Sequence, residues 1–379
     1  MKIVIIGTAY PLRGGIAHYI ALLASALKKR HVVEIITFKR QYPSFLFPGK
    51  TQEETDSAQH GESAPQLVDS LNPLNWVAVA RKIRSLKPDL LIFKYWLPFF
   101  GPCFGTIAKL AKRGTQTKAL IICDNVIPHE RRPGDIVFTR YFFSQADYFI
   151  VQSGAVEHEL TGFWPRAQYR RAAHPVYNMF GTPLPKADAR TAISEASQHL
   201  LLFFGYVRAY KGLNILLEAM ASVTARLDVH LLVVGEFYDD EKKYRALISK
   251  LNLEGHVTIH SEYVPNDLVG KYFSASDAIV LPYLSATQSG IAQIAYNFDK
   301  PVIATDVGGL SEVVLDGQTG FVVPPNNPMA LADAIVKFYD EHREQDFVSR
   351  VVQEKRKYSW DTMVSAIEDL AGASAATHG

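Results

Sequence analysis

Residues 199–220 read "HLLLFFGYVRAYKGLNILLEAM", a segment whose periodicity changes at Gly205. Before the glycine lies a nearly unbroken apolar run, which is typical of a strand buried on both faces. After it, apolar residues recur at the spacing of one helix face, at Leu213, Leu216, Leu217 and Met220. A strand followed by a helix is the repeating unit of proteins with parallel sheets.

The same unit recurs along the chain. Candidate strands in the first half are "KIVIIG", "VVEIITF", "DLLIFKYW", "KALIICDN" and "DYFIVQS". Those in the second half are "HLLLFFGYV", "VHLLVVGEF", "VTIHSEY", "DAIVLPY", "PVIATDVGG" and "GFVVPP". Because 379 residues exceed what one ordinary core accommodates, we expect two α/β domains, each with a doubly wound parallel sheet.

A break in the pattern marks the boundary between the domains. Residues 174–190, "HPVYNMFGTPLPKADAR", contain three prolines and read as a linker. We therefore predict domains at 1–177 and 178–359, with a terminal helix at about 360–372 that packs back on the first domain. Residues 45–75 also interrupt the rhythm and read as a loop.

Composition narrows the classes of function. With 48% hydrophobic and 21% charged residues, the chain is typical of soluble globular proteins. Two cysteines, Cys103 and Cys123, make neither a disulfide framework nor a metal cluster, which favours a cytoplasmic location. Because no run of 18 apolar residues occurs, we expect no membrane-spanning helix.

The net charge of +2 conceals an asymmetry between the halves: residues 1–177 carry a net +10 and residues 178–379 a net −8. A basic half favours an anionic partner, and we expect the inner face of a membrane, although solvated helices explain the same charge. The candidate contacts are Lys28, Lys29, Arg30, Lys39 and Arg40. Nucleic-acid binding ranks last, because the basic residues are dispersed.

Two cations follow the strand that ends near Gly205. Arg208 and Lys211 stand between this strand and the next helix, where a departing diphosphate would require positive charge and directed donors. Cations in loops are often only solvated. Their position after a strand and a glycine favours a phosphate site.

A loop of small residues, "LSATQSG", leads from another expected strand into a helix. The first free amides of that helix belong to Ser289, Gly290 and Ile291, and a helix N-terminus favours anions. We therefore expect these amides to bind the same diphosphate as Arg208 and Lys211.

Two sites in the first half complete the candidate set. Gly14 and Gly15 stand where a helix begins, so their amides could approach a ligand, although an ordinary turn is the alternative. Asp124 and His129 follow the strand "KALIICDN", at the edge where catalytic groups of open sheets collect. A histidine there can move a proton or donate to a sugar hydroxyl, or it can simply cap a loop.

Taken in order, these segments resemble a retaining glycosyltransferase of family 4, the group 1 glycosyl transferases. The matching segments span nearly the full chain: "GGIAHY", "NVIPHE", "GYVRAYKG", "LVVGE", "SDAIVLPY", "PVIATDVGGLSEVV" and "DGQTGFVVPP". The resemblance implies a GT-B fold, with two Rossmann-like domains facing a central cleft. It also implies transfer of a sugar from a nucleotide-diphosphate sugar, as co-substrate, to a saccharide or lipid-linked acceptor, with retention and without a metal or other cofactor.

By position, the resemblance assigns the donor phosphates to Arg208, Lys211 and the amides of residues 289–291, with Gly15 approaching from the other domain. The base and ribose would lie near Glu262, Tyr263 and Val264.

Two departures from the family pattern affect sugar recognition. The paired glutamates around the helix of the second domain are absent, since residues 286–287 and 294–295 hold no glutamate. Many relatives have a histidine where this chain has Asp124. We expect Gln288 and Asp124 to recognise the sugar instead. Alternatives are a catalytically impaired partner protein that binds nucleotide sugar, and an epimerase or hydrolase on the same fold.

Overall fold

The computed structural model describes residues 1–42, 63–127 and 132–372. The chain divides into two compact units: unit 1 contains Met1–Pro175 and Ser359–Gly379, and unit 2 contains Val176–Tyr358. The boundary expected after residue 177 lies two residues beyond the one between the units.

Unit 1 is built on a seven-stranded parallel sheet with the order β3-β2-β1-β4-β5-β6-β7. Its strands are β1 (Lys2–Ile6), β2 (Val32–Arg40), β3 (Gln66–Asp69), β4 (Leu90–Tyr95), β5 (Lys118–Cys123), β6 (Tyr148–Val151) and β7 (Tyr169–Arg171). The strand order reverses between β1 and β4, and ligands of doubly wound sheets bind beside such a point.

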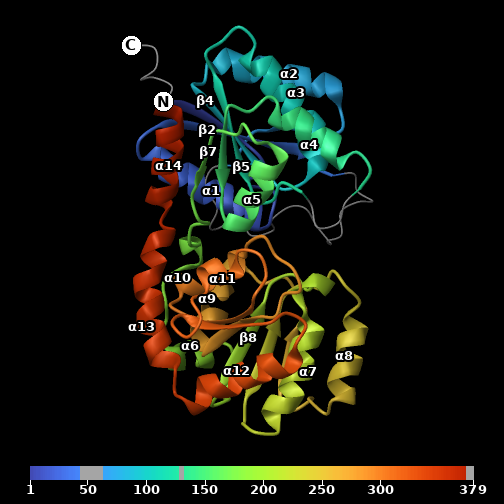
Figure 1. Ribbon diagram of the computed structural model, residues 1–379, viewed down its shortest axis with the longest axis vertical. Helices are drawn as coiled ribbons and strands as arrows, with labels where there is room; N and C mark the ends of the chain where they lie inside the picture. Colours follow the sequence, from blue (N-terminus) through green and yellow to red (C-terminus); the bar gives the residue numbers. More distant parts are fainter. Residues whose placement is uncertain (43–62, 128–131, 373–379) are drawn as a thin grey trace. The chain divides into compact units, whose positions relative to one another are not determined.

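The helices of unit 1 are α1 (Gly15–Lys28), α2 (Pro73–Leu86), α3 (Gly101–Lys112), α4 (Asp135–Phe143), α5 (Gly154–Phe163) and α14 (Trp360–Gly372), with a 3-10 turn at Pro98–Phe100. Helices α2, α3 and α4 pack side by side, and the terminal helix α14 lies along α1 (Figure 1). An ion pair of 2.9 Å between Arg30 and Glu368 fastens α14 to the end of α1.

Unit 2 is built on a six-stranded parallel sheet with the order β10-β9-β8-β11-β12-β13. The strands are β8 (Leu200–Phe204), β9 (His230–Val234), β10 (Val257–His260), β11 (Ala278–Leu281), β12 (Val302–Thr305) and β13 (Gly320–Val323). Here the order reverses between β8 and β11. The loops after these two strands therefore define the expected binding edge.

The helices of unit 2 are α6 (Lys186–Ala192), α7 (Leu213–Thr224), α8 (Glu241–Lys250), α9 (Asn266–Ala275), α10 (Gly290–Asn297), α11 (Leu310–Val313), α12 (Pro328–Asp340) and α13 (Glu344–Glu354). Phe203 of β8 belongs to the core that contains α7, α8 and α12. The next residue, Phe204, contacts Phe273 of α9, with ring centres 5.0 Å apart. Because successive strand side chains point to opposite faces, helices cover both sides of this sheet (Figure 1).

These observations confirm the predicted fold class, two doubly wound parallel sheets with helices. The sequence reading missed the short edge strands β3 and β7. The boundary between the units lies within the expected linker at 174–190, but the end of that stretch belongs to α6 (Lys186–Ala192), which packs on α9 within unit 2. Within the expected loop at 45–75, β3 and the start of α2 are ordered, and residues 43–62 lie outside the described parts.

Candidate functional site

The loops after β8 and β11 bring together most of the residues predicted to bind a diphosphate. The two strands are hydrogen-bonded neighbours, with Ile279 opposite Leu202. Since parallel strands end at the same edge, the loop with Arg208 and Lys211 meets the loop that precedes α10. The site thus lies at the reversal point of the unit 2 sheet.

The side chains of Lys211 and Ile291 meet at Gly205. A β-carbon added to Gly205 would lie 3.1 Å from Lys211 Nζ and 3.2 Å from Ile291 Cδ1. Gly205 has a φ of 95°, a conformation that glycine adopts readily and other residues avoid. The glycine therefore allows the lysine ammonium to lie beside the first turn of α10.

The backbone next to Lys211 packs against Pro282 at Gly212. At this residue φ is 68°, and a β-carbon would lie 2.0 Å from the carbonyl oxygen of Pro282, so only glycine fits. The Lys211 ammonium also lies 5.7 Å from the centre of the Tyr283 ring. Burial, together with the nearby charge of Arg208, lowers the pKa of Lys211 to about 7. Because the nearby charge of Arg208 has the same sign, an anion bound here would favour the protonated form of Lys211.

Unlike Lys211, Arg208 is exposed, but its guanidinium contacts an aromatic ring. The guanidinium carbon lies 4.9 Å from the centre of the Tyr238 ring, and Tyr238 stacks on Tyr206 at 4.5 Å. A cation placed over an aromatic face is attracted by the ring. The sequence reading did not identify Tyr238, because nothing in "GEFYDD" shows that the loop after β9 reaches Arg208.

The amino end of α10 has the expected form. Ser289 is its N-cap, and the Ser289 hydroxyl accepts a hydrogen bond of 3.4 Å from the Ala292 amide. The hydroxyl also lies 3.4 Å from that of Tyr283. Gly290 packs closely against Tyr177, because a β-carbon at residue 290 would lie 3.1 Å from the Tyr177 ring. The absent side chain at residue 290 thus accommodates Tyr177, which sequence reasoning did not foresee.

The loop that carries Gln288 is fixed by the turn after β12. The Gly309 amide donates to the Thr287 carbonyl at 3.1 Å, and a β-carbon at Gly308 would lie 1.6 Å from the Ala286 carbonyl oxygen. Gln288 itself is partly buried. The backbone just before the α10 N-terminus is therefore held against the turn after β12.

The residues predicted to lie near the nucleoside follow an outer strand. Tyr263 and Val264 come after β10, are partly buried, and are separated from β8 by β9. Since adjacent strands are about 4.8 Å apart, the end of β10 lies roughly 10 Å from the end of β8. That spacing is suited to a base and ribose attached to a diphosphate at Lys211.

In unit 1, Gly14 and Gly15 form the start of α1, as predicted. Gly14 is the N-cap with a φ of 111°, and apart from its chain neighbours no heavy atom of the described residues lies within 4 Å of the position of an added β-carbon. The first turn of α1 contains no acidic residue. The amides there can therefore approach an anion without a side chain in between.

Asp124 follows β5 directly, and its carboxylate accepts a hydrogen bond of 2.5 Å from Lys94 of β4. Sequence reasoning singled out the aspartate and missed the lysine, which stands within an apolar strand. His129, the other residue predicted for this edge, lies outside the described part of the chain.

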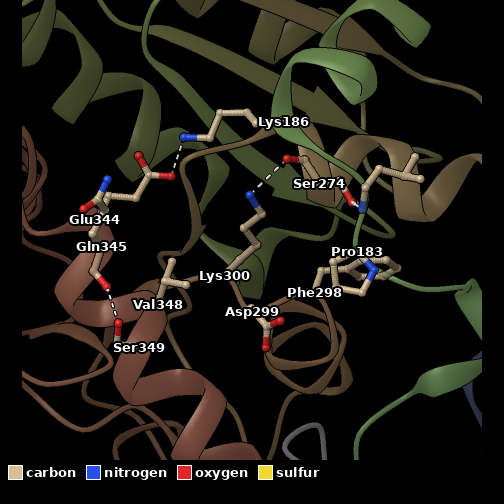
Figure 2. A pocket seen from close by; sticks show the side chains of 11 residues that line it. Pro183, Lys186, Ser274, Phe298, Asp299, Lys300, Glu344, Gln345, Val348 and Ser349 are labelled. Atoms are coloured by element: carbon tan, nitrogen blue, oxygen red, sulfur yellow. Dashed lines mark hydrogen bonds and ion pairs between the residues drawn. The ribbon is translucent and has the colours of Figure 1, made fainter.

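Unit 2 contains a pocket of about 520 Å³. Its lining includes Lys186, Lys300 and Glu344, which Figure 2 shows. Lys300 precedes β12, so the pocket lies at the amino edge of the sheet, opposite the diphosphate site. Its charges have partners within the unit. Lys300 donates to the carbonyls of Ser274 and Ser276 at 3.0 and 2.8 Å, and Lys186 pairs with Glu344. We interpret this pocket as a structural hollow.

Comparison with known proteins points to sugar-transfer enzymes. Residues 198–341 match the family described as "Glycosyl transferases group 1". A D-inositol 3-phosphate glycosyltransferase from Arthrobacter sp. (strain FB24) is 27% identical over 362 residues, covering 86% of this chain and 82% of that protein. The segment that matches the family, residues 198–341, contains Arg208, Lys211 and the α10 N-terminus.

Two solved structures resemble the whole chain. Sucrose-phosphate synthase from Thermosynechococcus elongatus has a TM-score of 0.76 at 19% identity, with full coverage of both chains. HepE of Anabaena, in complex with UDP and glucose, has a TM-score of 0.76 at 18% identity, covering 98% of this chain and all of that one. The fold is therefore of the GT-B type, and the match to group 1 glycosyl transferases lies within unit 2.

Proposed function

We propose that the protein is a retaining, metal-independent glycosyltransferase that moves a hexose from a nucleoside-diphosphate sugar to an acceptor hydroxyl. The observation on which this proposal depends is that Lys211 and Ile291 meet at Gly205, at the reversal point of the unit 2 sheet. The match of this unit to group 1 glycosyl transferases supports the proposal, as does the UDP bound to a structural neighbour.

In the proposed reaction, negative charge develops on the diphosphate as the bond between the anomeric carbon and the phosphate oxygen breaks. Lys211 and Arg208 stabilise that charge, and the amides of residues 289–291 donate hydrogen bonds to the same group. These cations take the electrostatic role that a metal has in other transferases.

The acceptor oxygen forms its new bond to the anomeric carbon on the face that the diphosphate leaves. Its proton passes to the departing phosphate oxygen, so atoms and charge balance without a protein nucleophile. Gln288 of unit 2 and Asp124 of unit 1 bind hydroxyl groups of the sugars in this proposal, and Tyr263 and Val264 lie along the nucleoside. Gly14 and Gly15 contribute backbone amides to the donor.

A panel of UDP, GDP and ADP sugars with inositol phosphate and lipid-linked saccharides as acceptors tests this function. The expected result is release of nucleoside diphosphate that requires an acceptor, persists in a chelator and gives a product of unchanged anomeric configuration. Free sugar without acceptor would instead indicate a hydrolase, and an epimerised donor an epimerase. Nucleotide binding with no turnover would indicate an impaired partner protein.

We also propose that a lipid-linked acceptor brings the basic unit 1 to an anionic membrane surface. No helix in the described parts is long and apolar enough to cross a bilayer. Of the five predicted contacts, Arg30 pairs with Glu368 and Arg40 with Asp69, whereas Lys28, Lys29 and Lys39 are exposed. Binding to anionic liposomes should weaken with salt; flotation that is indifferent to lipid charge would contradict the proposal.

A further inference from the structure

A buried lysine lies near the carboxyl end of β4, the central strand of the unit 1 sheet. Lys94 is the penultimate residue of β4, and its side chain is 2% exposed. Burial lowers the pKa of this lysine, while the Asp124 carboxylate opposes that effect. Because a charge inside a protein must be paired to be tolerated, the partners of Lys94 determine its role.

Three neighbouring groups surround the ammonium. Lys94 Nζ donates to Asp124 Oδ1 at 2.5 Å and to Gln152 Oε1 at 2.8 Å. It also lies 3.7 Å from the centre of the Tyr19 ring, whose hydroxyl accepts from Gln152 Nε2 at 3.1 Å. Asp124 follows β5, which lies next to β4 in the sheet, and Gln152 follows β6, which lies beyond β5.

The far side of the network is closed by aromatic rings. Tyr19 of α1 contacts His174 and Trp360, each with ring centres 5.1 Å apart. Burial, with the charge of Lys94, lowers the pKa of His174 to about 3, so this ring is neutral at physiological pH. The rings fix the Tyr19 face on which the ammonium rests.

The network reaches the surface at Asp124. Its side chain is 18% exposed, whereas Gln152 is 4% exposed. Oδ1 accepts from Lys94, and a carboxylate can accept about four hydrogen bonds in total. This carboxylate stands at the carboxyl edge of β5, where ligands of parallel sheets bind.

We propose that Lys94 is a positioning residue, which balances and orients the Asp124 carboxylate so that Asp124 accepts a hydrogen bond from a hydroxyl of a saccharide or polyol bound to unit 1. The proposal rests on the glycosyltransferase function above. It also explains why an aspartate can replace the histidine that many relatives have at this position. The charge of Asp124 is balanced by Lys94 on the neighbouring strand. Gln152 completes the support by donating to Tyr19 and accepting from Lys94.

Steady-state kinetics of Lys94→Met, Asp124→Asn and the double variant test the proposal. Each single change should raise the KM for the acceptor at least tenfold, and the double variant should be no worse than Asp124→Asn. The affinity for UDP, whose diphosphate is assigned to Arg208 and Lys211 of unit 2, should not change. Additive losses in the double variant, or an unchanged acceptor KM in Asp124→Asn, would overturn the proposal.

Lys112→Met is the matched control for stability. Lys112 pairs with Asp147 at 2.5 Å in the same unit, but Asp147 precedes β6 and so lies at the opposite edge. Loss of this pair should lower the melting temperature and leave the acceptor KM unchanged. If Lys94→Met does the same, and the double variant recovers both stability and rate, Lys94 has only a structural role.

A binding measurement separates this proposal from the proposed reaction. If the wild-type protein transfers no sugar, saturation-transfer NMR with myo-inositol and methyl α-glucoside as probes still reports on the Asp124 edge. The expected signal in the wild type is lost in Asp124→Asn and reduced in Lys94→Met. No signal in the wild type, or an equal signal in all three proteins, would refute the role of Lys94.

Discussion

Lys211 Nζ lies 3.1 Å from the point at which a β-carbon on Gly205 would stand, so the glycine and the lysine are fitted to each other. Replacing Gly205 with alanine should cost about 1–3 kcal/mol, because φ at this residue is positive, and should also displace the ammonium. Thermal unfolding and the KM for the donor measure the two effects. Gly317→Ala is the control, since Gly317 has a φ of 68° and, among the described residues, none beyond its chain neighbours lies within 4 Å of an added β-carbon. Equal donor KM values in the two variants would contradict the proposal that Gly205 makes room for the Lys211 ammonium.

Arg208→Ala and Lys211→Ala should each lower kcat by about 100-fold or more, because each removes a donor that stabilises the departing diphosphate. The folded state should persist, since neither side chain belongs to the apolar core. Lys250→Ala, which removes an exposed lysine at the end of α8, should leave turnover unchanged. Near-normal rates in both site variants would exclude these residues from the mechanism.

Nucleotide affinity should depend on pH through Lys211. With a pKa of about 7 in the free protein, the lysine loses its proton as the pH rises above 7. A bound diphosphate favours the charged form, so binding above pH 7 takes up a proton and weakens by about tenfold per pH unit. Calorimetry of UDP binding between pH 7 and 9, in buffers of different ionisation enthalpy, measures this uptake. Lys211→Arg should abolish it, because arginine stays charged.

Ser289→Ala should destabilise unit 2 by about 1 kcal/mol, since the N-cap hydrogen bond to Ala292 is lost. It should also weaken nucleotide binding, because the cap orients the first amides of α10. Asn327→Ala removes the N-cap of α12 in the same unit, where Asn327 accepts from Ala330 at 3.0 Å. That control should unfold at a similarly lowered temperature with unchanged UDP affinity. A matching loss of affinity in the control would show that the α10 terminus has no specific role.

Much of the fold could be predicted because the central strands are long apolar runs separated by helical periodicity. The edge strand β7 could not, since its three residues, Tyr169, Arg170 and Arg171, carry no apolar pattern. The short helix α6 was missed because its seven residues follow three prolines, although it packs on α9 in the folded unit.

The candidate site was predictable wherever a residue type and a strand end coincide, as at Arg208, Lys211 and Asp124. Residues that contact the site only because the sheet topology brings them there could not be predicted. Lys94 reads as an interruption of an apolar strand until the neighbouring strand brings Asp124 beside it. Tyr238 reaches Arg208 from the loop after β9, which lies beside β8 only in the folded sheet.

The central claim is that Arg208, Lys211 and the α10 N-terminus bind one diphosphate within unit 2. Calorimetry tests this claim most directly. The ligand is whichever of UDP, GDP and ADP binds most tightly, and its affinity is compared with that of the corresponding monophosphate. Both affinities are measured in the wild type and in the Arg208→Ala/Lys211→Ala variant. The account predicts that the diphosphate binds far more tightly than the monophosphate in the wild type and that this preference is lost in the variant. A preference of the same size in both proteins would contradict it.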